Sequence, residues 1–177
     1  MIAYVTTVGE RTLDACVSQL NRYGFDTVVL YGKEKWIDKY SRFLRIAKEP
    51  CIRVDADIVV NHRLKDAIPT GDCLMAQFSA FDVYRLDVHA GHVVYYTPEA
   101  VEIISKHLKE LDPERPETAA WRLPEFVDRT ITVDEVVGIH GLRPYEETLE
   151  RHLKHRKDRN QDIDFDWIEQ FREVLKK

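Results

Sequence analysis

The order of hydrophobic segments in the first 60 residues is the feature that most constrains the fold. Three apolar, β-branched runs are typical of buried strands and lie at residues 2–8, 26–31 and 51–60. Two segments with helical spacing of apolar residues separate them, at residues 12–23 and 36–48. Gly24 and Pro50 end these helices. This alternation requires right-handed crossovers, so we expect an α/β fold with a parallel sheet that binds its ligand beyond the carboxyl ends of the strands.

The second half of the sequence predicts a more mixed set of elements. Strands are expected at residues 73–81, 92–96 and 130–137. Helices are expected at 98–111, 117–126, 145–159 and 166–177. Pro98 suits the first turn of its helix, and Pro124 interrupts the helix that contains it. A Gly-His-Gly loop is predicted to follow the last strand.

Size, charge and cysteine usage exclude several classes of protein. The chain has 177 residues, which suits one domain, and its net charge of -5 argues against a protein that coats nucleic acid. Cys16, Cys51 and Cys73 are scattered and form no Cys-x-x-Cys pair, which argues against a disulfide framework or a structural zinc site. The sequence begins directly with a predicted strand and contains no apolar run of about 20 residues. We therefore expect a cytoplasmic protein with no signal peptide and no membrane span.

Asp55 and Asp57 lie in the middle of the third predicted strand, in the segment Arg-Val-Asp-Ala-Asp. Because side chains alternate along a strand, the two carboxylates would face the same side, about 7 Å apart. Their repulsion would be relieved by a shared Mg²⁺ or Mn²⁺ ion, which would also bridge to a diphosphate and stabilise it as a leaving group. The alternative is that both residues face solvent at a strand end, since Asp-x-Asp alone is a common pattern.

This element order, followed by Arg-Val-Asp-Ala-Asp, resembles the nucleotide-binding half of GT-A glycosyltransferases. In that family the Asp-x-Asp (DXD) motif holds Mn²⁺ or Mg²⁺ against the diphosphate of a sugar nucleotide. The resemblance implies a GT-A-like, mostly parallel sheet flanked by helices. It also implies a single domain with three parts: a nucleotide-binding half (1–61), an acceptor half (62–145) and C-terminal helices (146–177). It also implies that Asp57 chelates the metal and that Asp55 binds the metal or the ribose.

The loop after the first strand would line the nucleotide by the same resemblance. Thr6 and Thr7 offer hydroxyls, Gly9 permits close backbone approach, and Arg11 offers a guanidinium for phosphate or base. The alternative is an ordinary strand-to-helix turn with a solvated arginine.

His140 and Arg143 form the second informative segment, Gly-Ile-His-Gly-Leu-Arg-Pro-Tyr. The flanking glycines predict a tight loop close to a ligand, where His140 would complete the metal site and Arg143 would hold the diphosphate. Many metal-dependent GT-A enzymes carry such a C-terminal histidine, and the glycogenin-like group follows it with Gly and Lys-Pro-Trp. Here the basic residue comes three positions after the histidine rather than six, so the stereochemistry of that group is not transferred. The alternative is a loop histidine that caps the next helix.

Acidic residues on the acceptor side provide candidates for a general base. They are Asp82, Asp87, Glu117 and Asp128. Glu117 is preferred because family members often place an acidic residue near the start of an acceptor-side helix, although an acid there also suits the helix dipole. His89, His92 and Asp87 have the residue types of a metal cluster, but ordinary loop histidines fit this pattern better.

Residues 151–159 contain five basic residues and one acidic residue. Arg151 to Arg159 therefore form either a solvated helix face or a surface for an anionic acceptor such as nucleic acid.

The expected function is metal-dependent transfer of a sugar from a nucleotide sugar, a UDP-sugar in the first instance, to a hydroxyl acceptor. A nucleotidyltransferase is the first alternative, but it would carry a Gly-rich loop with a lysine after the first strand, whereas residues 6–11 contain one glycine and no lysine. A binding module that keeps the fold without turnover is the second alternative.

Overall fold

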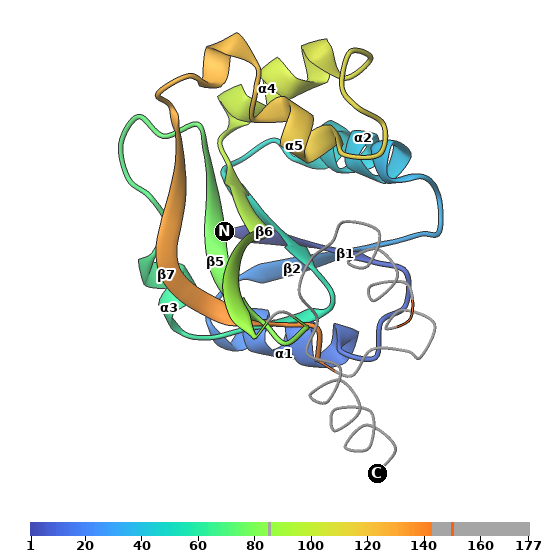
Figure 1. Cartoon of the computed structure of the whole chain (residues 1–177), viewed down its shortest axis with the longest axis vertical. Coiled ribbons are helices and arrows are strands. Elements are labelled where there is room, and N and C mark those ends of the chain that lie inside the picture. The colour runs from blue at the N-terminus through green and yellow to red at the C-terminus, as the bar shows by residue number, and fades with distance from the viewer. Residues whose placement is uncertain (85, 143–149, 151–177) are drawn as a thin grey trace.

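The computed structural model describes residues 1–84, 86–142 and 150 (Figure 1). Its strands are β1 (Ile2–Thr7), β2 (Asp26–Tyr31), β3 (Cys51–Asp55), β4 (Ile58–Val60), β5 (Met75–Asp82), β6 (Asp87–Tyr96) and β7 (Thr130–His140). Its helices are α1 (Leu13–Arg22), α2 (Trp36–Ile46), α3 (Arg63–Asp66), α4 (Pro98–His107), α5 (Pro116–Ala120) and the 3₁₀ helix η1 (Pro124–Phe126).

Within these residues the seven strands form one sheet in the order β2-β1-β3-β6-β5-β7-β4. β1 pairs in parallel with β2 and β3, and β5 pairs in parallel with β7. The pairs β3–β6, β5–β6 and β4–β7 are antiparallel. The expected α/β sheet flanked by helices is confirmed, with its uninterrupted parallel part in the first half of the chain.

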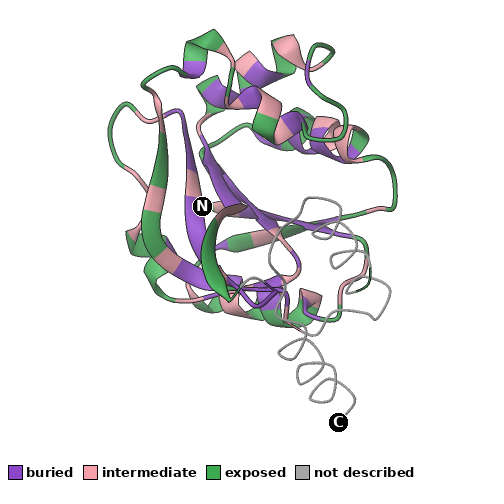
Figure 2. Ribbon diagram, viewed as in Figure 1, coloured by how far each residue is buried: buried purple, intermediate pink, exposed green. Residues whose placement is uncertain are grey.

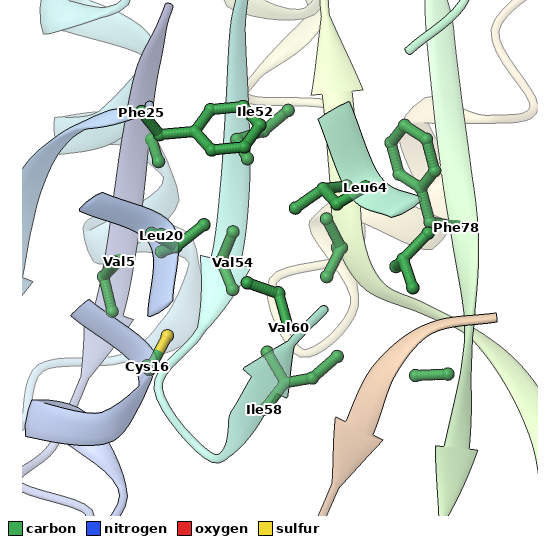
Figure 3. Packing of buried hydrophobic residues seen from close by; sticks show 14 of the residues in the cluster. Val5, Cys16, Leu20, Phe25, Ile52, Val54, Ile58, Val60, Leu64 and Phe78 are labelled. Atoms are coloured by element: carbon green, nitrogen blue, oxygen red, sulfur yellow. The ribbon is translucent and has the colours of Figure 1, made fainter. Parts of the chain in front are cut away.

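Helices cover both faces of the sheet because alternate residues of the central strands are apolar in both directions. Val5 and Val54 pack with α1 and α3 in one buried cluster, and Figure 3 draws most of its buried side chains. Tyr4 and Tyr96 belong to a second cluster with α2, α4 and α5, which lie together in Figure 1. Figure 2 shows that burial is concentrated in the central strands, whereas most of β2 and β7 is exposed or half-buried.

Helices α1 and α4 both begin where the sequence predicts, but only α4 has a side-chain cap. Thr97 accepts a hydrogen bond from the backbone N of Ala100, and Pro98 occupies the first turn of α4. Thr12 stands at the N-cap position of α1, but its hydroxyl donates to the carbonyl of Ala56 at 2.8 Å instead of capping the helix. Thr12 therefore ties α1 to the segment after β3.

The prediction of one strand over residues 51–60 is wrong. β3 ends at Asp55, the chain turns at Ala56 and Asp57, and β4 crosses to pair with β7. The turn is fixed because Ala56 donates its N–H to Thr6 O at 3.0 Å and accepts from Thr12. Asp55 and Asp57 are therefore not alternate residues of one strand, and the spacing argument for their shared face does not hold.

The prediction of a Gly-His-Gly loop is also wrong, because Gly138 and His140 belong to β7. A Cβ added to Gly138 would lie 2.8 Å from Val59 O, so this glycine permits the close approach of β4 to β7. Gly141 has a φ of +84°, and a Cβ there would lie 2.4 Å from the ring of Tyr84. Both glycines thus serve packing between segments of the protein.

Arg143 and the predicted helices at 145–159 and 166–177, including the basic segment from Arg151 to Arg159, lie outside the described residues, apart from residue 150. Among the residues that the structure describes, no helix is both long enough and apolar enough to span a bilayer.

Candidate functional site

Five acidic and imidazole side chains gather where the central strands end. Two come from the end of β3 and the turn after it, one from the end of β5, one from β6 and one from the end of β7. They are Asp55, Asp57, Asp82, His92 and His140, and we call them the Asp–His group. Residues far apart in sequence meet here because β5 and β7 run in parallel, with Asp82 directly opposite His140.

A bulge in β6 accounts for the position of His92. The pairing with β5 jumps from Phe78–Val93 to Ser79–Ala90, so Gly91 and His92 fall outside that ladder. Gly91 has a φ of +115°, a conformation that favours glycine. Bulges often occur next to functional sites because they redirect a side chain. Here the bulge carries His92, whose ring lies against the ring of His140.

The contacts within the Asp–His group are short. The rings of His92 and His140 stack with centroids 3.6 Å apart and planes at 13°. Asp57 Oδ2 lies 3.1 Å from His140 Nε2, and Asp82 Oδ2 lies 3.5 Å from His140 Nδ1. Asp55 Oδ2 lies 3.4 Å from His92 Nδ1. Thus the carboxylates of Asp57 and Asp82 lie on either side of the His140 imidazole, and the carboxylate of Asp55 contacts the His92 imidazole.

Burial and charge act in opposite directions on this group. Burial by itself would lower the pKa of His140, but hydrogen bonds and charge from Asp57 and Asp82 outweigh it and raise the pKa to about 10. Burial by itself would raise the pKa of Asp55, but Arg53 and His92 hold that pKa well below its usual range. At neutral pH without a cation, His140 is therefore protonated and Asp55 is ionised.

Arg53 is a buried cation beside this group, and its side chain is only 1% exposed. It forms an ion pair with Asp55 and donates to Glu117 through Nε at 2.9 Å and Nη2 at 2.6 Å. It also donates to Gly91 O at 3.3 Å, and its guanidinium lies 5.1 Å from the ring centroid of Trp36. Arg53 therefore links β3, the β6 bulge and α5.

A cavity of about 420 Å³ lies next to Arg53. Its lining combines a ring, charged groups and backbone from three parts of the chain: Trp36, Arg53, Asp55, His89, Ala90, Gly91, His92, Glu117 and Thr118. A space of this size suits a small ligand with polar groups. Two members of the Asp–His group, Asp55 and His92, face the same cavity as the predicted base.

The loop after β1 is held by its own side chains. The hydroxyl of Thr7 donates to Glu10, which also accepts from the backbone N of Val8 at 3.0 Å. Thr6 donates to Asp55 Oδ1 at 3.0 Å, so its hydroxyl supports the Asp–His group. Gly9 donates its N–H to Thr7 Oγ1 at 2.9 Å. Arg11 is exposed, and the structure leaves its role in nucleotide binding a prediction.

The structure thus brings together Thr6, Asp55, Asp57 and His140 from the predicted site, with Glu117 on the adjoining cavity. Asp87 and Asp128 are exposed residues that do not line that cavity.

Sequence reasoning missed Arg53 and the part played by Asp82 and His92. An arginine inside an otherwise apolar strand indicates a buried ion pair, because such a residue is almost never buried unpaired. The glycine before His92 was the local indication of a bulge.

The residues present fit a divalent metal ion. In the described chain, one set of ligand atoms from Asp82, His92 and His140 lies within 4.8 Å of one another. The Nε2 of His92 is buried and has no hydrogen-bond partner among the described residues. Carboxylate oxygens and imidazole nitrogens are ligands for first-row metal ions. Asp55 and Asp57, the predicted ligands, each contact one histidine of this set.

No protein-family model matches the sequence, and no curated protein matches it. Solved structures do match. A glycosyltransferase involved in the glycosylation of the major capsid of PBCV-1 aligns with a TM-score of 0.52 at 13% identity, covering 78% of this chain and 92% of that one.

Two other structures represent two kinds of transferase. A cytidylyltransferase from Leptospira borgpetersenii aligns with a TM-score of 0.53 at 12% identity, covering 98% of this chain and 93% of that one. A mutant Drosophila β1,4-galactosyltransferase 7 in complex with manganese, UDP-Gal and xylobiose aligns with a TM-score of 0.50 at 11% identity, covering 78% and 69%. At these identities the comparison concerns architecture: the chain has the GT-A-like α/β fold that glycosyltransferases and nucleotidyltransferases share.

Proposed function

We propose that the protein is a metal-dependent glycosyltransferase that moves a sugar from a nucleotide sugar, a UDP-sugar in the first instance, to a hydroxyl acceptor. The observation that carries this proposal is the Asp–His group at the carboxyl ends of the central strands, beside a cavity of about 420 Å³. In α/β sheets, ligands bind at this edge. The manganese and UDP-Gal in the galactosyltransferase structure fit the same chemistry.

Asp57, His140 and Asp55 would hold the cation, and of Mn²⁺ and Mg²⁺ we propose Mn²⁺. Mg²⁺ prefers an all-oxygen shell, whereas Mn²⁺ accepts imidazole more readily. When bound, the ion would supply positive charge to a leaving diphosphate.

Arg53 would keep Asp55 ionised and oriented toward that position. Its guanidinium pairs with Asp55 on one side and Glu117 on the other, while Thr6 bonds the same Asp55 oxygen. These contacts fix the carboxylate before a ligand arrives, which limits the reorganisation that binding requires.

Glu117 as general base stays a prediction. Its Oε1 accepts from Arg53 and Tyr96, and its Oε2 accepts from Arg53. A carboxylate with both oxygens engaged has little capacity to take a proton, so these contacts favour a positioning role for Glu117. Arg143 is still proposed to hold the diphosphate, and the segment from Arg151 to Arg159 to contact an anionic acceptor.

A nucleotidyltransferase is the second candidate, favoured by the cytidylyltransferase alignment over 98% of this chain. The loop after β1 argues against it. Residues 6–11 contain one glycine and no lysine, whereas the Gly-rich phosphate loop expected of a nucleotidyltransferase carries a lysine.

The test is calorimetry of UDP, CTP and UDP-sugars with and without Mn²⁺, followed by assays of sugar-nucleotide hydrolysis and of pyrophosphate release. The proposal expects Mn²⁺-dependent UDP-sugar binding and hydrolysis in the wild type. Asp57→Ala should remove this activity while far-ultraviolet circular dichroism stays unchanged.

Full turnover of Asp57→Ala in the presence of EDTA would contradict the mechanism. Pyrophosphate release from CTP and a sugar phosphate would favour the nucleotidyltransferase. Binding with neither reaction would favour the non-catalytic module.

A further inference from the structure

We propose that Asp82 and His92 join His140 as direct ligands of the cation, which makes the site a two-histidine centre that selects Mn²⁺ and Zn²⁺ over Mg²⁺. The inference rests on the proposed function in that it concerns the same cation. It goes further by assigning two ligands outside the Asp-x-Asp motif, with Asp55 holding His92 rather than the ion, and by adding Zn²⁺ to the metals that the site selects.

The first support is the convergence of three strands on one point. Asp82 ends β5, His140 ends the neighbouring β7, and the bulge in β6 directs His92 to the same place. One donor atom from each lies within 4.8 Å of the others. Ligand bonds of about 2.1 Å allow donors on one ion to be up to about 4.2 Å apart, so a cation would require these atoms to move closer. One of the two stacked imidazole rings would also rotate, because the ion must lie in the plane of each ring that binds it.

The second support is the bonding of the two ring nitrogens of His92. Its Nδ1 lies 3.4 Å from Asp55 Oδ2, whereas its buried Nε2 has no hydrogen-bond partner among the described residues. Metal-binding histidines typically present one nitrogen to the ion while a carboxylate holds the other. A buried nitrogen without a partner is costly, and a bound cation would satisfy it.

The third support is the burial of the other two side chains. The side chains of Asp82 and His140 are each only 5% exposed, and Asp82 Oδ1 accepts from Tyr84 N at 2.8 Å. Asp82 is thus held in place by the backbone after β5 while its second oxygen lies near His140. Two imidazoles and one carboxylate form a donor set that suits first-row transition metals, and two nitrogens in place of oxygens disfavour Mg²⁺.

The test is titration calorimetry of the chelator-treated full chain with MnCl₂, ZnCl₂ and MgCl₂, without nucleotide. Zn²⁺ should bind more tightly than Mn²⁺, and Mg²⁺ should bind at least about tenfold more weakly than Mn²⁺. His92→Gln and Asp82→Asn should each lower the Mn²⁺ affinity at least about tenfold. Mg²⁺ affinity equal to that of Mn²⁺ would overturn the inference.

His89→Gln is the matched control, because His89 lies on the same strand with its ring centroid 5.9 Å from that of His92, but is not part of the set of three. Its Mn²⁺ affinity should stay within about twofold of the wild type, a change well below that expected on losing a ligand. An equal loss in His89→Gln and His92→Gln would contradict the ligand assignment.

A second readout needs no variant. Pulsed electron paramagnetic resonance of the Mn²⁺-loaded wild type should show ¹⁴N couplings from two imidazoles, and one imidazole or none would overturn the inference.

Wild-type Mn²⁺ affinity in His92→Gln, combined with its loss in Asp57→Ala, would overturn this inference and leave the proposed function standing. Failure of every version to bind a cation, even with UDP present, would overturn both.

Discussion

The two halves of the sheet are built differently. The first half consists of β1, β2 and β3 in regular parallel register, connected by α1 and α2. The second half contains antiparallel pairs and register shifts, at Phe78/Ser79 between β5 and β6 and again between β5 and β7. Three members of the Asp–His group, Asp82, His92 and His140, come from this irregular half. The regular half contributes Asp55 at the end of a regular strand. The register shifts of the other half accompany the placement of Asp82, His92 and His140 in the same group.

The Arg53–Glu117 ion pair joins the two halves. Arg53 belongs to β3 and Glu117 to α5, 64 positions apart, and Nη2 of the first lies 2.6 Å from Oε2 of the second. Tyr96 in β6 also donates to Glu117. The regular and the irregular half of the sheet are therefore connected by a buried network of charged and hydroxyl groups.

The largest expected effect is that of Arg53→Met. This change leaves Asp55 and Glu117 without their buried cation and should lower the free energy of unfolding by about 3–5 kcal/mol. Urea denaturation measures it. Arg63→Ala removes an exposed pair with Glu135 and should cost less than about 1 kcal/mol. Similar losses in the two variants would show that the Arg53 network does not couple the halves.

Gly138→Ala should have the next largest effect. Its new Cβ would lie 2.8 Å from Val59 O and 3.1 Å from Val60 Cα, both backbone atoms of β4, and overpacking of this kind costs about 1–3 kcal/mol. Because His140 follows two residues later, Mn²⁺ affinity should also fall. Denaturant unfolding and calorimetry measure the two effects.

Gly32→Ala is the corresponding change in the regular half. The added Cβ would meet only the carboxyl end of Glu34, a flexible side chain that can move away. We expect a loss of less than about 1 kcal/mol and unchanged Mn²⁺ affinity. If Gly138→Ala were equally mild, the close approach of β4 to β7 would not be what fixes His140.

The smallest effects are expected from two threonines, and they differ in kind. Thr97→Ala removes the cap of α4, and Thr12→Ala removes the bond to Ala56 O, so each should cost about 1 kcal/mol of stability. Only Thr12→Ala should weaken Mn²⁺ binding, because Ala56 lies in the turn that carries Asp57. Unfolding curves paired with metal titrations distinguish the two, and equal metal affinities would show that this turn is held by other contacts.

Local patterns determined the regular part of this protein. The strand at 26–31 is found at its predicted bounds, and α4 begins at Pro98 as expected. Apolar periodicity and cap residues act over a few positions, so they can be read from the chain alone. The choice of Asp55 and His140 as neighbours in one site came from a family resemblance, and the structure places them in one group.

Only the tertiary structure decided how that group is arranged. The break after Asp55 depends on hydrogen bonds that Ala56 donates to Thr6 and accepts from Thr12, both more than 40 residues away along the chain. The position of His92 depends on a bulge whose partner strand is β5, and the burial of Arg53 depends on Glu117 in α5. Such contacts leave almost no periodic trace in the sequence, because they arise between segments that meet only when the sheet has formed.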